Sequence, residues 1–144
     1  MPMENLLEGH IPLTSDLLYR SPGARISAEI YLPVRHCLAV SLVNSSIASI
    51  ISSQEAFAQC RQFISKLYPE AALLNAKSSA EAMESVAKQG LENAAAIGDE
   101  DLAGRLGLKV LHHDIGDEKN NETRYAVIST RKSPAPTGAD KTTA

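Results

Sequence analysis

Adjacent Thr123 and Arg124 combine two groups suited to chemistry on an acidic substrate. An arginine guanidinium binds a carboxylate through two parallel hydrogen bonds, and a threonine hydroxyl can donate a hydrogen bond to a departing oxygen. Neighbours on a strand point to opposite faces of the sheet, so both can line one surface only where the strand is bulged or ends. A solvent-exposed strand hydroxyl for Thr123, and an ion pair of Arg124 with Asp114 or Asp117, are the structural alternatives.

Ser52 and Gln59 form a second candidate pair. They lie seven residues apart, which is two helical turns and places them on one side of a helix. Ser52-Ser53-Gln54-Glu55 is a capping box, in which the first serine caps the helix and the glutamate three residues on reaches back. An anion could bind at the same helix terminus. Plain capping for Ser52 and a solvent-facing position for Gln59 are the alternatives.

Asn5 is the third candidate, because its amide could donate to a carboxylate or a hydroxyl; an asparagine that caps a turn is the alternative. His36 is expected to be a satisfied core histidine. Cys37 and Cys60 lie in apolar surroundings, which predicts buried, reduced thiols rather than a disulfide. The histidines and cysteines do not have the spacing of metal ligands, so no metal and no cofactor are predicted.

The composition excludes several classes of partner. The 144 residues can form one substantial core, and 44% apolar with 22% charged residues is ordinary for a globular protein. A net charge of −3 with scattered charges argues against nucleic acid as a partner. No apolar run has the length of a membrane span, and the N-terminus has no signal-peptide pattern, so the sequence predicts a cytoplasmic protein without a membrane partner.

Strand-like and helix-like patterns alternate along the chain. Helix starts are predicted at Ser52, at the second capping box Ser78–Glu81 and at the acidic residues 99–101. The first helix is expected to place Phe57, Cys60, Ile64 and Leu67 on one face. Strands are predicted at 28–32, 36–40, 71–74 (buried), 94–98, 109–112 and 124–129. The alternation predicts an α/β fold, with a mostly parallel or mixed sheet flanked by helices.

Four separated motifs, in order, resemble those of prephenate dehydratases. They are spread along the chain from residue 2 to residue 125: Pro2-Met3-Glu4-Asn5-Leu6-Leu7-Glu8-Gly9, Leu32-Pro33-Val34-Arg35-His36-Cys37-Leu38, Ser52-Ser53-Gln54-Glu55-Ala56-Phe57-Ala58-Gln59-Cys60 and Asn121-Glu122-Thr123-Arg124-Tyr125. Two shorter stretches, 78–82 and 95–98, also fit. The chain departs from the family pattern at Leu6, where the family has a serine or threonine beside the asparagine.

The resemblance implies one lobe of a two-lobe catalytic domain, similar in plan to periplasmic binding proteins, with the substrate between the lobes. Residues 1–132 would be a partial catalytic domain without its first strand–helix segments. Residues 133–144, rich in Pro, Gly, Thr and Lys, would be a linker toward an absent ACT regulatory domain. The implied partners are the small molecule prephenate, the missing N-terminal lobe segment and ACT domain of the same enzyme, and a second copy in a full-length homodimer.

The resemblance also implies a reaction, the decarboxylating dehydration of prephenate to phenylpyruvate in phenylalanine biosynthesis, which is the work of a carbon–oxygen lyase. Thr123 would be the catalytic residue. The substrate-binding residues would be Asn5, Glu4, Ser52, Gln59 and Arg124. The alternative hypothesis is a truncated, non-catalytic remnant or a small-ligand-binding module of the same fold, which Leu6 and the missing first strands favour.

Overall fold

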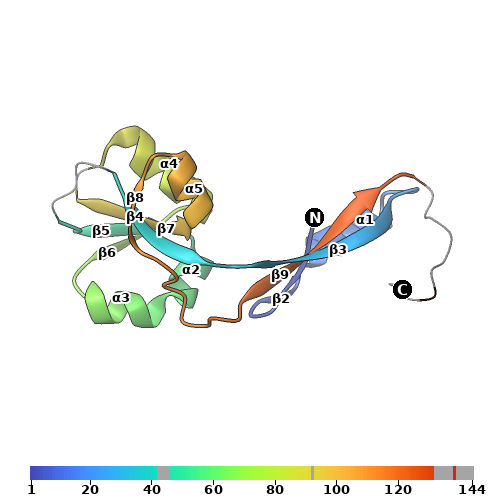
Figure 1. Cartoon of the computed structure of the whole chain (residues 1–144), viewed down its shortest axis with the longest axis horizontal. Coiled ribbons are helices and arrows are strands. Elements are labelled where there is room, and N and C mark those ends of the chain that lie inside the picture. Colours follow the sequence, from blue (N-terminus) through green and yellow to red (C-terminus); the bar gives the residue numbers. More distant parts are fainter. Residues whose placement is uncertain (42–45, 92, 132–137, 139–144) are drawn as a thin grey trace. The chain divides into compact units, whose positions relative to one another are not determined.

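The computed structural model describes residues 1–41, 46–91, 93–131 and 138. The chain divides into two compact units (Figure 1). The terminal unit contains Met1–Pro33 and Glu122–Ala144, and the central unit contains Val34–Asn121. The predicted linker, 133–144, lies outside the described residues except for residue 138. The chain passes between the two units twice, after Pro33 and after Asn121.

The terminal unit is built on a four-stranded sheet in the order β2-β1-β9-β3, with antiparallel pairing throughout. Its elements are β1 (Pro2–Asn5), β2 (Gly9–His10), α1 (Pro12–Tyr19), β3 (Arg25–Pro33) and β9 (Glu122–Ser129). In β1 the side chains alternate, with Met3 and Asn5 buried and Pro2 and Glu4 exposed. Gly9, the first residue of β2, has a φ of +80°, a conformation that glycine adopts without strain.

The central unit is a mixed five-stranded sheet in the order β6-β5-β7-β4-β8, with helices on both faces (Figure 1). Its elements are β4 (His36–Val40), β5 (Ser49–Ser52), α2 (Gln54–Gln59), α3 (Arg61–Leu67), β6 (Ala72–Asn75), α4 (Ser79–Gln89), β7 (Ala94–Asp99), α5 (Glu100–Arg105) and β8 (Lys109–His112). The predicted mixed α/β fold is confirmed. Parallel pairing is limited to β5 with β6 and β7, because β4 runs antiparallel to both β7 and β8.

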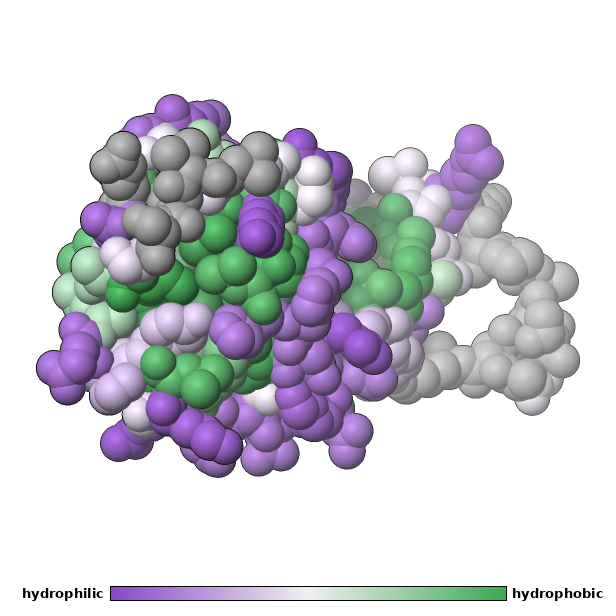
Figure 2. Space-filling model, turned by 60° about the vertical axis from the view of Figure 1, so that its left-hand side comes forward, coloured by the Kyte–Doolittle hydropathy of each residue, from purple (hydrophilic) through white to green (hydrophobic). Residues whose placement is uncertain are grey.

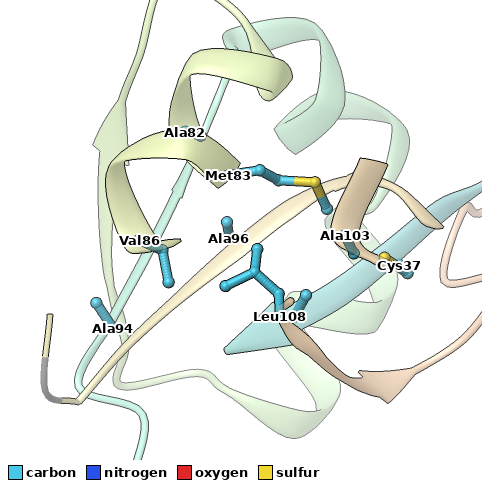
Figure 3. Packing of buried hydrophobic residues seen from close by; sticks show 9 residues of the cluster. Cys37, Ala82, Met83, Val86, Ala94, Ala96, Ala103 and Leu108 are labelled. Carbon is cyan, nitrogen blue, oxygen red and sulfur yellow. The ribbon is translucent and has the colours of Figure 1, made fainter. Parts of the chain in front are cut away.

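Two hydrophobic clusters lie on opposite faces of the central sheet. Along β7, Ala94 and Ala96 contact the cluster under α4 and α5, whereas Ala95 and Ile97 contact the cluster under α2 and α3. Figure 3 shows the first cluster, in which Met83 of α4 lies above Ala96. Both faces of β4 and β7 are therefore covered, which explains why these strands read as continuous apolar runs rather than as alternating ones.

The helix caps of α4 and α5 follow the predictions. The Ser78 hydroxyl accepts from the Glu81 amide at 3.1 Å, and α4 ends at Gly90 in the left-handed conformation. The Asp99 carboxylate accepts from the Leu102 amide at 3.0 Å at the start of α5. Local side-chain chemistry is sufficient to set these ends.

Two predictions in the central unit are wrong. The single helix expected to carry Phe57 to Leu67 on one face is broken at Cys60 (φ −118°, ψ 19°) into α2 and α3. Phe57, Cys60 and Ile64 still pack in one cluster, but Leu67 is 48% exposed. The strand at β6 is present, but it forms the edge of the sheet, and Leu73 and Leu74 are exposed rather than buried. Figure 2 shows hydrophobic residues at the surface of this unit, bordered by hydrophilic ones.

Candidate functional site

Asn5 and Thr123 meet in the terminal unit across the β1–β9 pairing. The two residues are partners in the antiparallel register, and both are buried. The Asn5 amide nitrogen, Nδ2, donates to the Thr123 hydroxyl, Oγ1, at 2.9 Å. A hydroxyl that accepts in this way keeps its own proton for another acceptor. The structure thus joins two of the residues that the sequence singled out, 118 positions apart.

Asn5 also organises the turn that follows β1. Its side-chain oxygen, Oδ1, accepts from the backbone amides of Leu7 at 2.9 Å and Glu8 at 3.1 Å. These bonds are the turn-capping role that was the alternative for this residue. The same amide therefore caps the turn with its oxygen and orients the Thr123 hydroxyl with its nitrogen.

Arg124 forms ion pairs with two carboxylates of the terminal unit. Its guanidinium lies 2.6 Å from Glu29 of β3 and 3.2 Å from Glu4 of β1. The hydrogen bond to Glu29 raises the pKa of Arg124 above its ordinary value, although partial burial acts in the opposite direction. The expectation of an ion pair is met with different partners.

Asp114 and Asp117 were the wrong candidates for that pair. Asp114 pairs with Lys119 at 3.3 Å, and Asp117 accepts from the backbone amide of Gln62. Thr123 and Arg124 are consecutive in β9, and their side chains contact consecutive residues of β1. Thr123 bonds to Asn5, and Arg124 pairs with Glu4. This pattern agrees with the expectation that they point to opposite faces.

Ser52 does not cap a helix, which corrects the prediction. It is the last residue of β5, it is fully buried, and its hydroxyl donates to the carbonyl oxygen of Ile97 at 2.7 Å. The N-cap of α2 is Ser53, whose hydroxyl accepts from the Ala56 amide at 3.3 Å. Parallel pairing of β5 with β6 extends through Ser52 and delays the helix by one residue. Ser52 and Gln59 consequently do not share a helix face.

Gln59 is held by two side chains of the central unit rather than facing solvent. Its oxygen, Oε1, lies 2.8 Å from Nε2 of His36 and accepts from Nδ2 of Asn121 at 3.1 Å. Asn121 is buried, and the other two side chains are half-buried. His36, expected to be a satisfied core histidine, is bonded through Nε2 only, and its buried Nδ1 has no hydrogen-bond partner among the described residues.

His36 and Asn121 were not among the predicted site residues. Both stand in the quoted motifs, so the signal was present, but only the tertiary contacts connect them to Gln59.

The two cysteines are free and buried, as predicted. Burial raises the pKa of the Cys37 thiol to about 11 and that of Cys60 to about 12. Both thiols are therefore protonated near pH 7, and neither is a reactive nucleophile there. Within the described ranges, no group of three acidic, histidine or cysteine side chains is placed to hold a metal ion. None of the helices described has the length and hydropathy of a membrane span.

A family model described as prephenate dehydratase matches residues 1–133. A prephenate dehydratase of Methanocaldococcus jannaschii is 35% identical over 131 residues, which are 91% of this chain and 47% of that protein. The structure of prephenate dehydratase from Arthrobacter aurescens in complex with L-Phe superposes with a TM-score of 0.83 at 29% identity, covering 96% of this chain and 47% of that one. The structure of GqqA, described as a novel type of quorum quenching acylase, gives 0.82 at 28% identity, covering 94% and 49%. The chain thus spans about half the length of the relatives it matches.

Proposed function

Because the chain belongs to the prephenate dehydratase family, we propose that it contributes to the conversion of prephenate to phenylpyruvate in phenylalanine biosynthesis. The observation that carries the proposal is the buried hydrogen bond from Asn5 to the Thr123 hydroxyl. It joins the first and the last of the four motifs in one polar arrangement. Buried polar groups of this kind are costly to keep unless each is hydrogen-bonded.

The reaction requires little covalent chemistry from the protein. The carbon–carbon bond to the ring carboxylate breaks, its electron pair enters the ring, the ring hydroxyl leaves with a proton as water, and carbon dioxide is released. Aromatisation drives both steps, so the enzyme gains most by stabilising the leaving oxygen as its charge develops. A neutral hydrogen-bond donor suits the leaving oxygen. A cation bound to the ring carboxylate would instead stabilise that carboxylate and oppose the release of carbon dioxide.

Thr123 is the residue we assign to the leaving oxygen. Since its Oγ1 accepts from Asn5, its O–H bond is directed to another acceptor and polarised as a donor. Asn5 acts in this proposal mainly by positioning Thr123, because its oxygen is occupied by the turn amides. Gln59 is the substrate-binding donor that we retain from the central unit.

Three other residues carry less weight in the proposed binding of substrate. Glu4 and Arg124 pair with each other, and Glu29 forms the shorter contact to the guanidinium, so a substrate carboxylate would have to displace a carboxylate already in place. The Ser52 hydroxyl donates to the Ile97 carbonyl inside the sheet. We assign these residues to the support of the sheets in their own units.

We further propose that polypeptide corresponding to the rest of the relatives' length, an ACT domain included, completes a homodimeric enzyme. The terminal unit supports the idea of a partner surface, because Leu13, Ile30, Tyr31 and Leu32 are all more than 45% exposed. The free thiols fit a reducing compartment, and we propose a cytoplasmic location.

Phenylpyruvate formation from prephenate, measured with the polypeptide that completes the proposed enzyme present and with Thr123→Ala beside Thr123→Ser, tests the function. The serine variant keeps the hydroxyl and is expected to retain activity, whereas the alanine variant is expected to lose at least about a hundredfold in kcat, the usual scale for one transition-state donor. Prephenate binding without any turnover, equal in both variants, would favour the small-ligand-binding module instead.

A second candidate function is hydrolysis of an acyl bond. The hydroxyl of Ser15 lies 3.0 Å from Nε2 of His10, the contact that a nucleophile and its base require, and the GqqA structure is described as an acylase. Hydrolysis of an acyl bond that is lost in Ser15→Ala would support it. Hydrolysis that is unchanged in that variant, or absent from the parent chain, would reject it.

A further inference from the structure

The edge strand β6 of the central sheet has one side without a partner strand. The backbone amides of Ala72 and Ala76, at its two ends, donate to carbonyl oxygens on the β5 side at 2.9 and 2.8 Å. Backbone groups point to alternate sides along a strand, so those of Leu73 and Asn75 point away from β5. Among the described residues, no strand lies beyond β6. The N–H and C=O groups of Leu73 and Asn75 therefore form a row of hydrogen-bonding groups at an open edge.

The other sheet edges in the described part of the chain are better protected against pairing with another chain. Strand β2 has only two residues, and β3 has a register shift between Ile26 and Ala28. Strand β8 contains the charged residue Lys109, and its pairing with β4 has a register shift. Strand β6 reads Ala-Leu-Leu-Asn, without charge, proline or register shift. Its short length is the one usual protection that it has, so β6 is the edge best suited to accept an added strand.

Both faces of β6 carry an exposed leucine. Leu73 is in register with Ile50, which belongs to the cluster under α2 and α3. Leu74 is in register with Ile51, which packs against the cluster under α4 and α5. Each leucine is 48% exposed. A strand added beside β6 would cover both side chains and also satisfy the open backbone groups.

A second copy of β6 matches this edge when it runs antiparallel to the first about a two-fold axis at Leu74. In this register Leu74 faces Leu74 of the second copy, and Leu73 of each copy faces Asn75 of the other. A hydrogen-bonded antiparallel pair exchanges both of its N–H···O bonds, so the two Leu73–Asn75 pairs satisfy every open group of both strands. A register centred on Leu73 would instead pair Asn75 with Ala71, whose amide already donates to Tyr68.

The charges beside β6 also favour a second copy in this orientation. Glu70 precedes the strand and Lys77 follows it, and neither side chain has an ion pair among the described residues. The Glu81 carboxylate accepts from the Lys77 backbone amide at 2.9 Å, at the start of α4. Antiparallel pairing places the Glu70 end of one copy beside the Lys77 end of the other, where the opposite charges attract.

We infer that β6 is a dimerisation edge, at which a second copy of this chain extends the five-stranded sheet across a two-fold axis at Leu74. The inference rests on the homodimer of the proposed function and names one surface between its two copies. A contact of this size belongs to the weak class of interfaces, so we expect a monomer–dimer equilibrium of the chain between about 10 µM and 1 mM.

Sedimentation equilibrium of the 144-residue chain, with Leu74→Lys beside Leu73→Lys, tests the edge. The two leucines are equally exposed, so both variants are expected to fold, which circular dichroism checks. Leu74→Lys places like charges opposite each other on the axis, and we expect the dissociation constant of the dimer to rise at least about tenfold. Leu73→Lys places the lysine opposite Asn75 and is expected to raise it by a smaller factor. A chain that is monomeric throughout this range, a dimer that Leu74→Lys leaves intact, or a larger effect of Leu73→Lys would overturn the inference.

Backbone hydrogen exchange distinguishes a second copy from other occupants of the edge. The Leu73 and Asn75 amides are expected to exchange more slowly as the chain concentration rises, whereas the Leu74 amide, which points to β5, should change less. Slow exchange at Leu73 and Asn75 in the monomer would show that another part of the chain covers the edge. Slowing that requires the polypeptide completing the proposed enzyme would assign the edge to that polypeptide. Either result would overturn the inference.

Reversing the charges tests the orientation of the second copy. Lys77→Glu places acidic residues side by side and is expected to weaken the dimer, whereas the exchange Glu70→Lys/Lys77→Glu restores opposite charges and should recover the parent affinity. A double variant as weak as Lys77→Glu would contradict the antiparallel orientation. A completed enzyme that fails to convert prephenate, while the chain dimerises at β6, would reject the proposed function alone.

Discussion

The two units of this chain are stabilised in different ways. The central unit holds 18 of the 20 buried hydrophobic residues among the described ones, whereas the terminal unit holds only Met3 and Ala126. The terminal unit instead buries the polar residues Asn5, Thr14 and Thr123. Its sheet depends largely on strand pairing and on side-chain hydrogen bonds, while the central sheet has a packed apolar layer on each face.

This difference in packing predicts different mechanical properties for the two units. A packed apolar layer resists deformation, so the central unit is suited to hold Gln59 in one orientation. A sheet with few buried apolar residues derives less stability from its own packing and gains more from hydrogen bonds and partners. We therefore expect mutations of equal size to have unequal effects in the two units, which the following changes test.

The largest effect is expected for Leu38→Ala in the central unit. Leu38 is fully buried, and truncation of such a residue costs the lost transfer energy plus a cavity, about 3 kcal/mol. The matched control in the terminal unit is Leu32→Ala, where 49% exposure predicts a change within about 0.5 kcal/mol. Urea unfolding followed by circular dichroism compares the two. Equal losses would show that the terminal unit has an apolar core of its own.

Asn5→Ala should be the most damaging polar change in the terminal unit. It removes the bonds to the turn amides and to Thr123, and we expect a loss of about 2 kcal/mol. Asn5→Asp keeps the oxygen that caps the turn and loses the amide nitrogen that donates to the Thr123 hydroxyl and to the Glu122 carbonyl, so its loss should be smaller. Native-state hydrogen exchange at the Leu7 and Glu8 amides measures both. Exchange that stays as slow in Asn5→Ala as in the parent chain would contradict the assigned cap.

Gly98→Ala probes how tightly the central unit is packed. An added Cβ would lie 2.9 Å from Sδ of Met83, which is fully buried in α4, so we expect a loss of about 1 to 2 kcal/mol. Combining it with Met83→Leu removes the sulfur atom and should recover part of that loss in a double-mutant cycle. A Gly98→Ala variant as stable as the parent chain would mean that this layer can still adjust.

The smallest effect near neutral pH comes from the thiols of the central unit. The pKa values of Cys37 and Cys60 are raised in the folded state to about 11 and 12, so the folded protein keeps these protons where the unfolded chain loses them. Their contribution to stability is complete below about pH 9 and falls as the pH rises above that value. Unfolding measured from pH 7 to 10.5 should show this decline. A Cys37→Ala/Cys60→Ala variant should show less of it, and an identical decline would assign it to other groups.

Local sequence signals predicted the helix ends where a side chain caps its own helix. Ser78 and Asp99 lie beside the amides that they bind, so tertiary contacts hardly enter. Helix α1 has no such cap: its N-cap is Ile11, with Pro12 as the first helical residue, and no capping pattern signalled it. The capping-box pattern wrongly predicted Ser52 as the cap of α2, because strand pairing of β5 extends through Ser52 and leaves Ser53 as the cap.

Burial at the edges of the sheet could not be predicted from apolar runs. Leu73 and Leu74 have the composition of a core strand, but β6 has a neighbour on one side only. Strand order is decided by which segments pair, and a short apolar run is compatible with a central or an edge position.

The sequence by itself determined the α/β class, the capped helices α4 and α5, the buried thiols and the four motifs that contain the candidate residues, because each depends on neighbours within a few positions. The tertiary structure alone decided that Asn5 meets Thr123, that Glu4 and Glu29 pair with Arg124, and that His36 and Asn121 bind Gln59. These contacts join segments 23 to 120 residues apart. Their partners are chosen by strand register and helix packing, which one-dimensional patterns do not contain.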